Sequence, residues 1–287
     1  MTGPITAQTR IAGVVGHPVR HSLSPVIHNA WIEAAGLDAV YLAFAPPRDG
    51  FAPLVDGLRG GTVLGLNVTL PFKEEALALA DEASPAAASA GAANLLLLAE
   101  NGSIRADNTD GVGLIAALEG AGFDPAAGRC VVLGAGGAAR GAVLALLEAG
   151  APEVAVLNRT RARVDALAAL DARVSAHDWT DRAPLEGAAA LINATSLGMI
   201  GQPPLEIELN AVPRQAVVMD MVYKPLKTEL LVAAERRGHR IADGLGMLIG
   251  QAAPSFRAMF GQAPPAGVDV RALCEKALGG KGWGEAS

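Results

Sequence analysis

The stretch CVVLGAGGAAR, residues 130–140, joins a short apolar run to a glycine-rich turn and the start of a helical pattern. The spacing of Gly134, Gly136 and Ala139 fits G-x-G-x-x-A, in which the glycines allow a tight turn and a close backbone approach to a pyrophosphate, while the small third residue keeps helix and strand together. The amide groups and positive dipole end of such a helix attract phosphate. Similar turns occur at ordinary strand–helix corners, but the position between strand and helix favours a dinucleotide site. The residues expected along the cofactor are Gly134, Ala135, Gly136, Gly137 and Ala138.

The next strand indicates which dinucleotide is bound. An NAD site usually has Asp or Glu about 20 residues beyond the glycines, where it accepts hydrogen bonds from the ribose 2′-hydroxyl. Here the apolar run 154–157 ends in Asn158, Arg159 and Thr160, and Arg163 follows one helical turn after Arg159. Arginine binds phosphate oxygens bidentately. The sequence therefore predicts NADP(H), with Arg159 and Arg163 at the 2′-phosphate; the alternative is two solvated arginines at a helix start.

The rest of the chain repeats the alternation of apolar runs and helical patterns, which predicts an α/β fold with mostly parallel sheets covered by helices on both faces. Asn101-Gly102 predicts a tight hairpin, and the stretch 120–128 predicts a domain boundary. We expect an N-terminal, mostly parallel α/β substrate domain, residues 1–112 plus 245–287, and a Rossmann-type NADP-binding domain, residues 113–244. The long helical pattern 247–260 would return the chain to the first domain, and the last residues, GGKGWGEAS, are expected to fray. The expected strands are 11–15, 40–44, 63–69, 95–98, 130–133, 154–157, 191–193, 217–221 and 240–242.

Composition excludes several classes of protein. The chain has 287 residues, of which 51% are hydrophobic and 18% charged, so it has enough apolar content for one large or two medium domains and is not expected to be disordered. Lys plus Arg is 23 and Asp plus Glu is 29, a formal net charge of −6 without basic runs, which argues against a nucleic-acid partner. The long uncharged stretch 187–205 contains two prolines and several polar residues, so no membrane span is expected.

The N-terminus, the cysteines and the histidines bear on cellular location and metal binding. The N-terminal MTGPITAQTR lacks a basic n-region and an apolar h-region, so no secretory signal is expected. Cys130 and Cys274 lie far apart outside any CxxC spacing, which favours free thiols in a reducing cytoplasm. The five histidines are scattered without ligand spacing, so no metal site is expected.

Polar residues follow the first strand in GHPVRHSLSP, residues 16–25. Ser22 and Ser24 are two positions apart, so in an extended chain their hydroxyls would project to one side. Pro25 suits the first position of a helix, with Ser24 as its N-cap. Two hydroxyls beside a helix N-terminus would suit a carboxylate, although on this segment alone a plain cap and turn is the simpler interpretation. Residues expected to pack the helix rather than bind a ligand are His28, Asn29 and Trp31.

A second polar group follows the third strand in GLNVTLPFK, residues 65–73. Asn67 and Thr69 share one strand face near its C-terminal end, where parallel sheets bind ligands. Lys73 falls in the first turn of the next helix, and Asp110 opens a later one; each alone could be a surface group. Reduction of a ketone by hydride produces an alkoxide that needs a proton, and a Lys–Asp pair beside a nicotinamide would hold and transfer it by general acid–base catalysis. The sequence leaves open which of the two delivers the proton.

Taken together, these motifs resemble the shikimate dehydrogenase family over nearly the whole chain. The segments that carry the resemblance are HSLSPVIHN (21–29), GLNVTLPFK (65–73), GAAN (91–94), DNTDG (107–111), GAGGAAR (134–140), NRT (158–160), NATSLGM (193–199), DMVYKPLKT (220–228) and DGLGMLIGQA (243–252). The resemblance implies the reversible NADPH-dependent reduction of 3-dehydroshikimate to shikimate in aromatic amino acid biosynthesis, with Lys73 and Asp110 as the catalytic pair. It implies Ser22 and Ser24 at the substrate carboxylate and further substrate contacts from Asn67, Thr69, Asn94, Tyr223 and Gln251. For the loops over the nicotinamide end it implies Thr195, Met221 and Gly244.

Relatives that act on quinate share most of these motifs. Serine at both carboxylate positions resembles the shikimate-preferring members, and Arg159 with Arg163 favours NADP over the NAD used by some quinate-oxidising relatives. A pocket packed tightly around shikimate would exclude the extra hydroxyl of quinate. One departure is that GAAN continues with Leu95 where members commonly have threonine, which removes one peripheral hydroxyl.

Three alternatives therefore stay open: a dual quinate/shikimate dehydrogenase, an aminoshikimate dehydrogenase, and a non-catalytic relative that senses the metabolite. Retention of Lys73, Asp110 and the cofactor turn speaks against the last of these. The expected partners are a small-molecule substrate, with no nucleic acid and no membrane, and the expected assembly is a monomer or homodimer.

Overall fold

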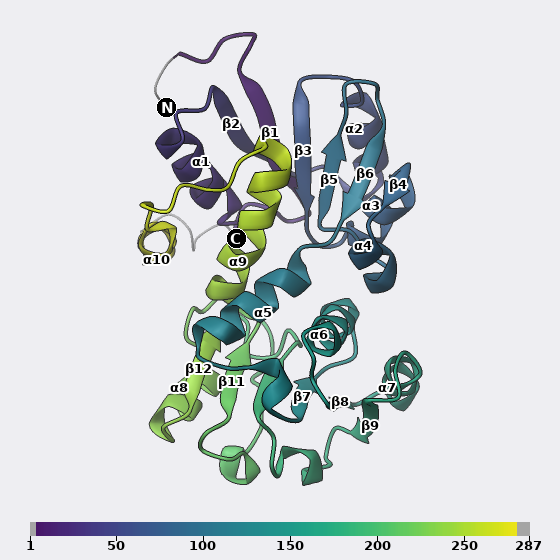
Figure 1. Cartoon of the computed structure of the whole chain (residues 1–287), viewed down its shortest axis with the longest axis vertical. Helices are drawn as coiled ribbons and strands as arrows, with labels where there is room; N and C mark the ends of the chain where they lie inside the picture. The colour runs from purple at the N-terminus through teal and green to yellow at the C-terminus, as the bar shows by residue number, and fades with distance from the viewer. Residues whose placement is uncertain (1–3, 280–287) are drawn as a thin grey trace. The chain divides into compact units, whose positions relative to one another are not determined.

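The computed structural model describes residues 4–279, so most of the tail expected to fray lies outside the described residues. The chain divides into two compact units (Figure 1). The first runs to Thr109 and resumes at Gln251, and the second is Asp110–Gly250. The expected boundaries fell at 112/113 and 244/245. The difference arises because α5 (Asp110–Gly120) belongs to the second unit from its first residue, while α9 (Gly244–Phe260) passes from the second unit into the first.

The first unit is built on one mixed sheet in the order β2-β1-β3-β5-β6-β4 (Figure 1). Strands β1, β2 and β3 are parallel, whereas β5 runs antiparallel to both β3 and β6. The hairpin expected at Asn101-Gly102 joins β5 and β6. The strands are β1 (Arg10–Val15), β2 (Ala39–Phe44), β3 (Val63–Val68), β4 (Glu82–Ala83), β5 (Leu95–Leu98) and β6 (Ile104–Asp107). The helices are α1 (Ser24–Ala34), α2 (Phe51–Gly57), α3 (Lys73–Leu79), α4 (Pro85–Ala90) and α10 (Val270–Gly279), together with the second half of α9.

Both faces of this sheet are covered, as strand β3 shows. Leu66 and Val68 join a buried cluster with residues of α2, α3 and α4. Gly65 and Asn67 point to the opposite face, because successive side chains alternate along a strand; there Asn67 hydrogen-bonds to Ser255 of α9. A buried strand of this kind positions a polar residue such as Asn67 firmly.

The second unit contains a fully parallel sheet in the order β12-β11-β10-β7-β8-β9. Numbered within the unit, this is the 3-2-1-4-5-6 order of the Rossmann fold, in which the strand order reverses between the first and fourth strands, here β7 and β10. The fold-class prediction is thereby confirmed. The strands are β7 (Cys130–Leu133), β8 (Val154–Asn158), β9 (Val174–Asp178), β10 (Ala190–Asn193), β11 (Val217–Asp220) and β12 (Arg240–Asp243). The helices are α5, α6 (Gly137–Glu148), α7 (Arg161–Ala168), α8 (Glu229–Arg236) and the first half of α9.

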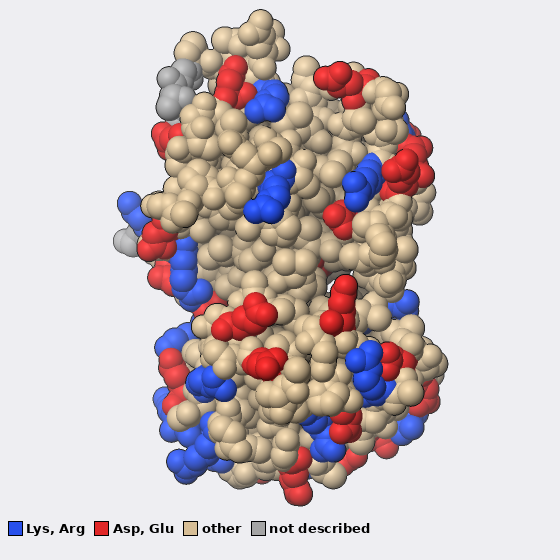
Figure 2. All heavy atoms as spheres, in the orientation of Figure 1, with Lys and Arg blue, Asp and Glu red and all other residues tan. Residues whose placement is uncertain are grey.

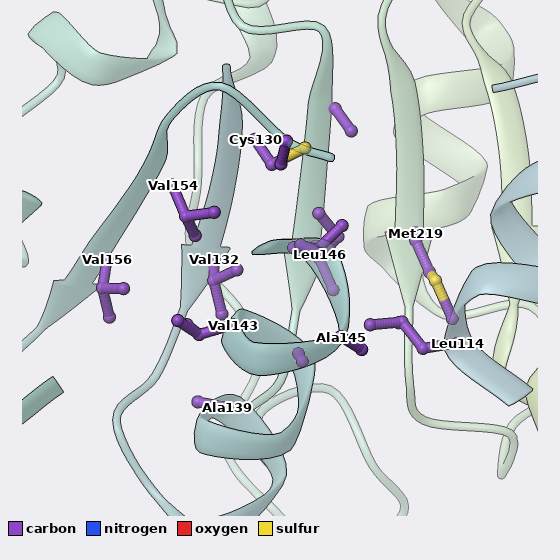
Figure 3. Packing of buried hydrophobic residues seen from close by; sticks show 14 of the residues in the cluster. Leu114, Cys130, Val132, Ala139, Val143, Ala145, Leu146, Val154, Val156 and Met219 are labelled. Atoms are coloured by element: carbon purple, nitrogen blue, oxygen red, sulfur yellow. The ribbon is translucent and has the colours of Figure 1, made fainter. Parts of the chain in front are cut away.

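Helix α6 anchors the glycine-rich turn to a dry core. Figure 3 shows Val143 and Leu146 of α6 beside Val132 of β7 and Val154 of β8, and all four side chains are fully buried. Complete burial of an aliphatic side chain is worth about 1.5–3 kcal/mol. The start of α6 is therefore held at a fixed distance from the end of β7.

The structure differs from the expected local structure at the two serines and at two edge strands. Helix α1 begins at Ser24 itself, after Leu23 in a helical conformation (φ −87°, ψ −5°), so Ser24 is not the N-cap and the two serines do not lie in extended chain. Strand β9 was not expected, because an edge strand needs little apolar surface and only Val174 of its five residues is buried. The short strand β4 was not expected either, since both of its residues are exposed.

The distribution of surface charge and the length of the helices can be compared with the expected absence of nucleic-acid and membrane partners. On the face shown in Figure 2, acidic and basic side chains are interspersed. Among residues 4–279, none of the helices combines the length and the apolar content that a membrane crossing requires.

Candidate active site

The glycine-rich turn leaves space beside the amide groups of α6. Gly134 follows β7 with φ +106°, a conformation that favours glycine, and a Cβ there would lie 3.0 Å from Cγ2 of Thr195. Gly136 is the N-cap of α6 and Gly137 its first residue; a Cβ at either would meet nothing within 4 Å. Ala139 is fully buried. The turn thus has a packed side and an open side, and the open side carries the amide groups that bind phosphate in such folds.

Two arginines stand at the end of the neighbouring strand. Arg159 and Arg163 are both exposed, next to the start of α7. Arg161 between them is paired with Asp165 at 2.8 Å. In the described part of the chain, neither Arg159 nor Arg163 forms an ion pair, whereas Asn158 donates from Nδ2 to the carbonyl of Thr160 at 3.2 Å and holds the turn. These two guanidinium groups can therefore bind an anion without first breaking a salt bridge.

The other predicted cofactor residues lie at the same edge of the sheet. Thr195 follows β10; its hydroxyl donates to Oδ1 of Asn193 at 2.7 Å and accepts from the amide of Leu197 at 3.1 Å. Met221 follows β11, and Gly244 follows β12, where a Cβ would clash with the carbonyl oxygen of Met221. In a parallel sheet the carboxyl ends share one edge, and ligands bind where the strand order reverses. The second unit thus places its predicted cofactor residues along the carboxyl edge of one sheet, on both sides of the point between β7 and β10.

In the first unit, the segments after β1 and β3 pack against each other. A Cβ on Gly16 would clash with Cγ2 of Thr69, so glycine suits this close approach. The amide of Thr69 donates to the carbonyl of Val15 at 2.9 Å, and that of His17 donates to Leu70 at 3.0 Å. Since β1 lies between β2 and β3, this is again the point where the strand order reverses.

A chain of hydrogen bonds links three of the predicted substrate residues of this unit, Asn67, Asn94 and Gln251. Tyr41 of β2 donates its phenolic hydrogen to Oδ1 of Asn67 at 2.8 Å. Burial raises the pKa of Tyr41 well above its ordinary value, and a hydrogen bond with Ser24 acts in the opposite direction. Nδ2 of Asn67 donates to the carbonyl of Asn94 at 3.2 Å and to the hydroxyl of Ser255 at 3.0 Å. Asn67 is therefore held by a buried tyrosine.

Asn94 forms the second half of this network. Its Nδ2 donates to Oε1 of Gln251 at 2.7 Å and to the hydroxyl of Thr109 at 3.0 Å. Its Oδ1 accepts from the backbone amide of Thr109 at 2.8 Å. Because Thr109 immediately precedes Asp110, these bonds fix the backbone just before α5 begins.

The remaining predicted residues occupy the expected elements. Ser22 is half-buried, and its Oγ accepts from the amide of Ser24 at 3.3 Å. Lys73 is the first residue of α3, and its carbonyl accepts from the amide of Ala93 at 2.8 Å. Asp110 begins α5, and Asp110 and Tyr223 belong to the second unit.

Sequence reasoning missed three members of the network: Tyr41, Thr109 and Ser255. Tyr41 had one available signal, because a tyrosine on the inward face of a strand needs a partner for its hydroxyl. Ser255 lies four residues after Gln251, on the same face of α9. As expected, His28 is a packing residue: it is buried and stacks on Tyr41 with ring centroids 4.2 Å apart. Among the described residues, no group of His, Cys, Asp and Glu could hold a metal ion.

Comparison with known proteins places this geometry in a family. Residues 14–96 match the shikimate dehydrogenase substrate binding domain, residues 121–197 match shikimate / quinate 5-dehydrogenase, and residues 244–274 match the shikimate 5'-dehydrogenase C-terminal domain. The chain is 56% identical over 283 residues to the shikimate dehydrogenase (NADP(+)) of Caulobacter vibrioides, covering 97% of this chain and 99% of that protein. The chain belongs to the shikimate dehydrogenase family. The resemblance inferred from the sequence motifs is therefore confirmed.

Solved structures of the family agree with this assignment. The shikimate 5-dehydrogenase of Thermus thermophilus in complex with NADP(H) and shikimate is 37% identical, with a TM-score of 0.81, and the match covers 93% of this chain and 98% of that one. The quinate dehydrogenase of Corynebacterium glutamicum in complex with NAD is 29% identical, with a TM-score of 0.84, and covers 94% of this chain and 99% of that one. The shikimate dehydrogenase family fold thus accommodates both cofactors. The residues after β8 are therefore needed to infer which cofactor a given member prefers.

Proposed function

We propose that this member of the shikimate dehydrogenase family catalyses the reversible NADPH-dependent reduction of 3-dehydroshikimate to shikimate, on the route to aromatic amino acids. The observation that carries the proposal is the pairing of an open glycine turn with two arginines free of ion pairs after the next strand. That combination fits a phosphorylated dinucleotide. The hydrogen-bonded amides and hydroxyls of the first unit fit a small polyhydroxylated acid.

The two units would divide the work. We assign most of the substrate binding to the first unit, expected as residues 1–112 plus 245–287, and cofactor binding to the second, expected as residues 113–244. In each unit, the candidate residues gather where the strand order reverses, the position at which α/β sheets bind ligands.

NADP(H) would supply the hydride, and the second unit would hold it through three groups of residues. The amide groups of Gly134, Ala135, Gly136, Gly137 and Ala138 face the pyrophosphate. Asn158, Arg159, Thr160 and Arg163 bind the 2′-phosphorylated ribose. Thr195, Met221 and Gly244 line the nicotinamide end.

The substrate would be read by prearranged hydrogen bonds. Ser22 and Ser24 bind its carboxylate, and Asn67, Thr69, Asn94, Tyr223 and Gln251 bind its hydroxyls. Oε1 of Gln251 already accepts from Asn94, and among residues 4–279 its Nε2 donates to no protein group. Gln251 would therefore act as a hydrogen-bond donor to a substrate hydroxyl. An amide fixed in this way loses little entropy on binding.

Lys73 and Asp110 would manage the proton. In the reducing direction, the carbonyl oxygen of the substrate becomes an alkoxide as hydride arrives, and one of the pair donates a proton to it. In the oxidising direction, the same pair removes the proton from the hydroxyl. Both residues begin helices, α3 and α5, so their backbones are fixed by regular structure.

Quinate is the main competing substrate. The absence of a carboxylate after β8 and the presence of Arg159 and Arg163 favour NADP, and with it the shikimate-preferring branch. The expected assembly is a monomer or homodimer. The two cysteines are free and buried, which suits a reducing cytoplasm.

The test is an assay of the purified protein that follows the near-ultraviolet absorbance of reduced nicotinamide, with shikimate or quinate and with NADP or NAD. We expect the highest kcat/KM for shikimate with NADP. Lys73→Ala is expected to lower kcat about 10²–10⁴-fold with a modest change in KM, the pattern of a group used mainly in the transition state. If the protein binds shikimate yet never reduces NADP, the metabolite-sensing alternative replaces this proposal.

A further inference from the structure

Asp220 is a buried carboxylate that the proposed chemistry does not use. It is the last residue of β11 and has 0% exposed surface. Oδ1 accepts from Nδ2 of Asn193 at 2.9 Å and from the amide of Val222 at 3.0 Å, and Oδ2 accepts from the hydroxyl of Thr228 at 2.6 Å. In the described part of the chain, no lysine, arginine or histidine pairs with it. Burying a charge without an ionic partner costs free energy, which its hydrogen bonds must offset. These bonds therefore point to a specific role for the carboxylate.

The first of these bonds controls the loop after β10. Asn193 lies directly across from Asp220 in the register of β10 and β11. Besides its bond to Asp220, its Nδ2 donates to the carbonyl of Leu197 at 3.2 Å, and its Oδ1 accepts from both the amide and the hydroxyl of Thr195, at 3.0 and 2.7 Å. An amide with both hydrogens and its oxygen engaged has one orientation. Asp220 thus fixes the orientation of the Asn193 side chain, which in turn holds Thr195 in place.

The other two bonds control the segment after β11. The amide of Val222 lies between Met221 and Tyr223, and the backbone of Met221 and Val222 is where Gly244 makes its close approach. Thr228 is the N-cap of α8, and its hydroxyl accepts from the amide of Leu231 at 3.4 Å while it donates to Asp220. The carboxylate therefore fixes both ends of the segment from Met221 to Thr228.

These loops also contact the cofactor turn and each other. Cγ2 of Thr195 would lie 3.0 Å from a Cβ on Gly134. The amide of Ile200 donates to the carbonyl of Lys224 at 3.0 Å. A shift of the loop after β10 or of the loop after β11 would therefore change the position of the other loop and of the glycine-rich turn.

We propose that Asp220 is a positioning residue that holds the loops after β10 and β11 in the arrangement that receives the nicotinamide end of the cofactor. Because it is completely buried, it acts through Asn193, Val222 and Thr228 rather than on the cofactor itself. This inference rests on the proposed role of Thr195 and Met221 at the nicotinamide end. It predicts that Asp220 matters for one half of the dinucleotide and not for the other.

The donors explain why a carboxylate is required. The groups at Oδ1, an amide nitrogen of Asn193 and a backbone nitrogen, can only donate, so an asparagine at position 220 must place its oxygen there. Its NH2 group then faces the hydroxyl of Thr228, which can no longer donate its hydrogen to residue 220. Asp220→Asn should therefore keep two of the bonds and remove the bond that Thr228 donates to a carboxylate, which makes it a mild probe with nearly unchanged volume.

The experiment compares two ligands by titration calorimetry on the full chain. NADPH carries both halves of the cofactor, whereas 2′,5′-ADP carries the 2′-phosphate and no nicotinamide. For Asp220→Asn we expect the Kd for NADPH to rise about tenfold and kcat to fall by a similar factor, as for the loss of one hydrogen bond to a charged group, while the Kd for 2′,5′-ADP stays within about twofold. Asp171→Asn, which removes a half-exposed carboxylate paired with Arg173 in the same unit, is the matched control and should change neither Kd.

Equal weakening of both ligands, or no weakening of either, overturns the inference. If the wild-type protein itself binds neither ligand, the proposed function fails and not the role of Asp220. Should Asp220→Asn not fold, Thr228→Val and Thr228→Ser replace it, since serine keeps the hydroxyl that valine removes. We expect the valine variant alone to weaken NADPH selectively; equal behaviour of the two variants would contradict the proposal.

Discussion

The hydroxyl of Tyr41 donates to Oδ1 of Asn67 across 2.8 Å, and both side chains are buried in the first unit. Nδ2 of Asn67 gives its hydrogens to the carbonyl of Asn94 and the hydroxyl of Ser255. What Asn67 has left for a substrate is the remaining lone pair of Oδ1. Tyr41 therefore determines which hydrogen-bonding role Asn67 can play, although its own side chain is almost completely buried.

Removing this hydroxyl should loosen substrate binding. For Tyr41→Phe we expect the KM for shikimate to rise about three- to tenfold with a smaller change in kcat, and the free energy of unfolding to fall by about 1–2 kcal/mol, because a buried acceptor loses its donor. Steady-state kinetics and urea unfolding measure the two effects. Trp31→Phe is the control: it disturbs the same buried layer, in which Trp31 packs on His28, without touching Asn67, so it should alter stability and not KM. An unchanged KM in Tyr41→Phe would show that Asn67 needs no anchor.

Cofactor preference should depend on Arg159. We expect Arg159→Ala to raise the KM for NADP about ten- to hundredfold and to leave the KM for NAD nearly unchanged, because hydrogen bonds to a charged group contribute about 1.5–3 kcal/mol each. Arg161→Ala is the matched control, since Arg161 lies in the same turn but is paired with Asp165. Equal losses with NADP and NAD would refute the assignment of Arg159 to the 2′-phosphate.

The dinucleotide half could be predicted from sequence because its signals are local. A strand, a glycine turn and a helix within 130–140 are contiguous, and the arginines that replace the usual acid follow the next strand directly. Because these residues are neighbours in the chain, their pattern can be recognised in the sequence alone. The edge strand β9 shows the limit, because its pairing with β8 comes from the sheet and not from its own polar residues.

In the substrate half, the sequence predicted which residues take part, but it did not predict the hydrogen bonds that connect them. Tyr41, Thr109 and Ser255 are separated in sequence from the groups they hold, and only the packing of β2, β3 and α9 brings them to Asn67 and Asn94. Ser24 illustrates a different failure. A helix boundary moved by one residue is beyond the resolution of pattern reasoning, yet it changed the predicted geometry of both serines.

Acid should destabilise the first unit through His28. Burial lowers the pKa of this imidazole to about 3, and its Nδ1 has no hydrogen-bond partner. Below the ordinary pKa of histidine, near 6.5, the unfolded chain takes up a proton that the folded state refuses until the pH approaches 3. Stability is therefore lost as the pH falls through this window, by about 1.4 kcal/mol per pH unit.

The test replaces His28 with phenylalanine, which keeps a ring against Tyr41 and cannot titrate. We expect the free energy of unfolding of the wild type to drop by about 2 kcal/mol more than that of His28→Phe between pH 7 and pH 5, as measured by urea unfolding at both values. Parallel losses in the two proteins would mean that His28 does not carry the effect.

Two glycines of the cofactor turn should respond in opposite ways to the same substitution. At Gly136, φ is −93° and an added Cβ meets nothing within 4 Å, so Gly136→Ala should leave thermal stability nearly unchanged. The methyl group would occupy the space proposed for the pyrophosphate, however, and the Kd for NADPH should rise about tenfold or more. At Gly134, φ of +106° and the approach of Thr195 mean that Gly134→Ala should cost about 1–2 kcal/mol of folding free energy even without cofactor. Thermal unfolding and calorimetric titration of both variants separate the two effects, and a Gly136→Ala protein that binds NADPH normally would place the pyrophosphate elsewhere.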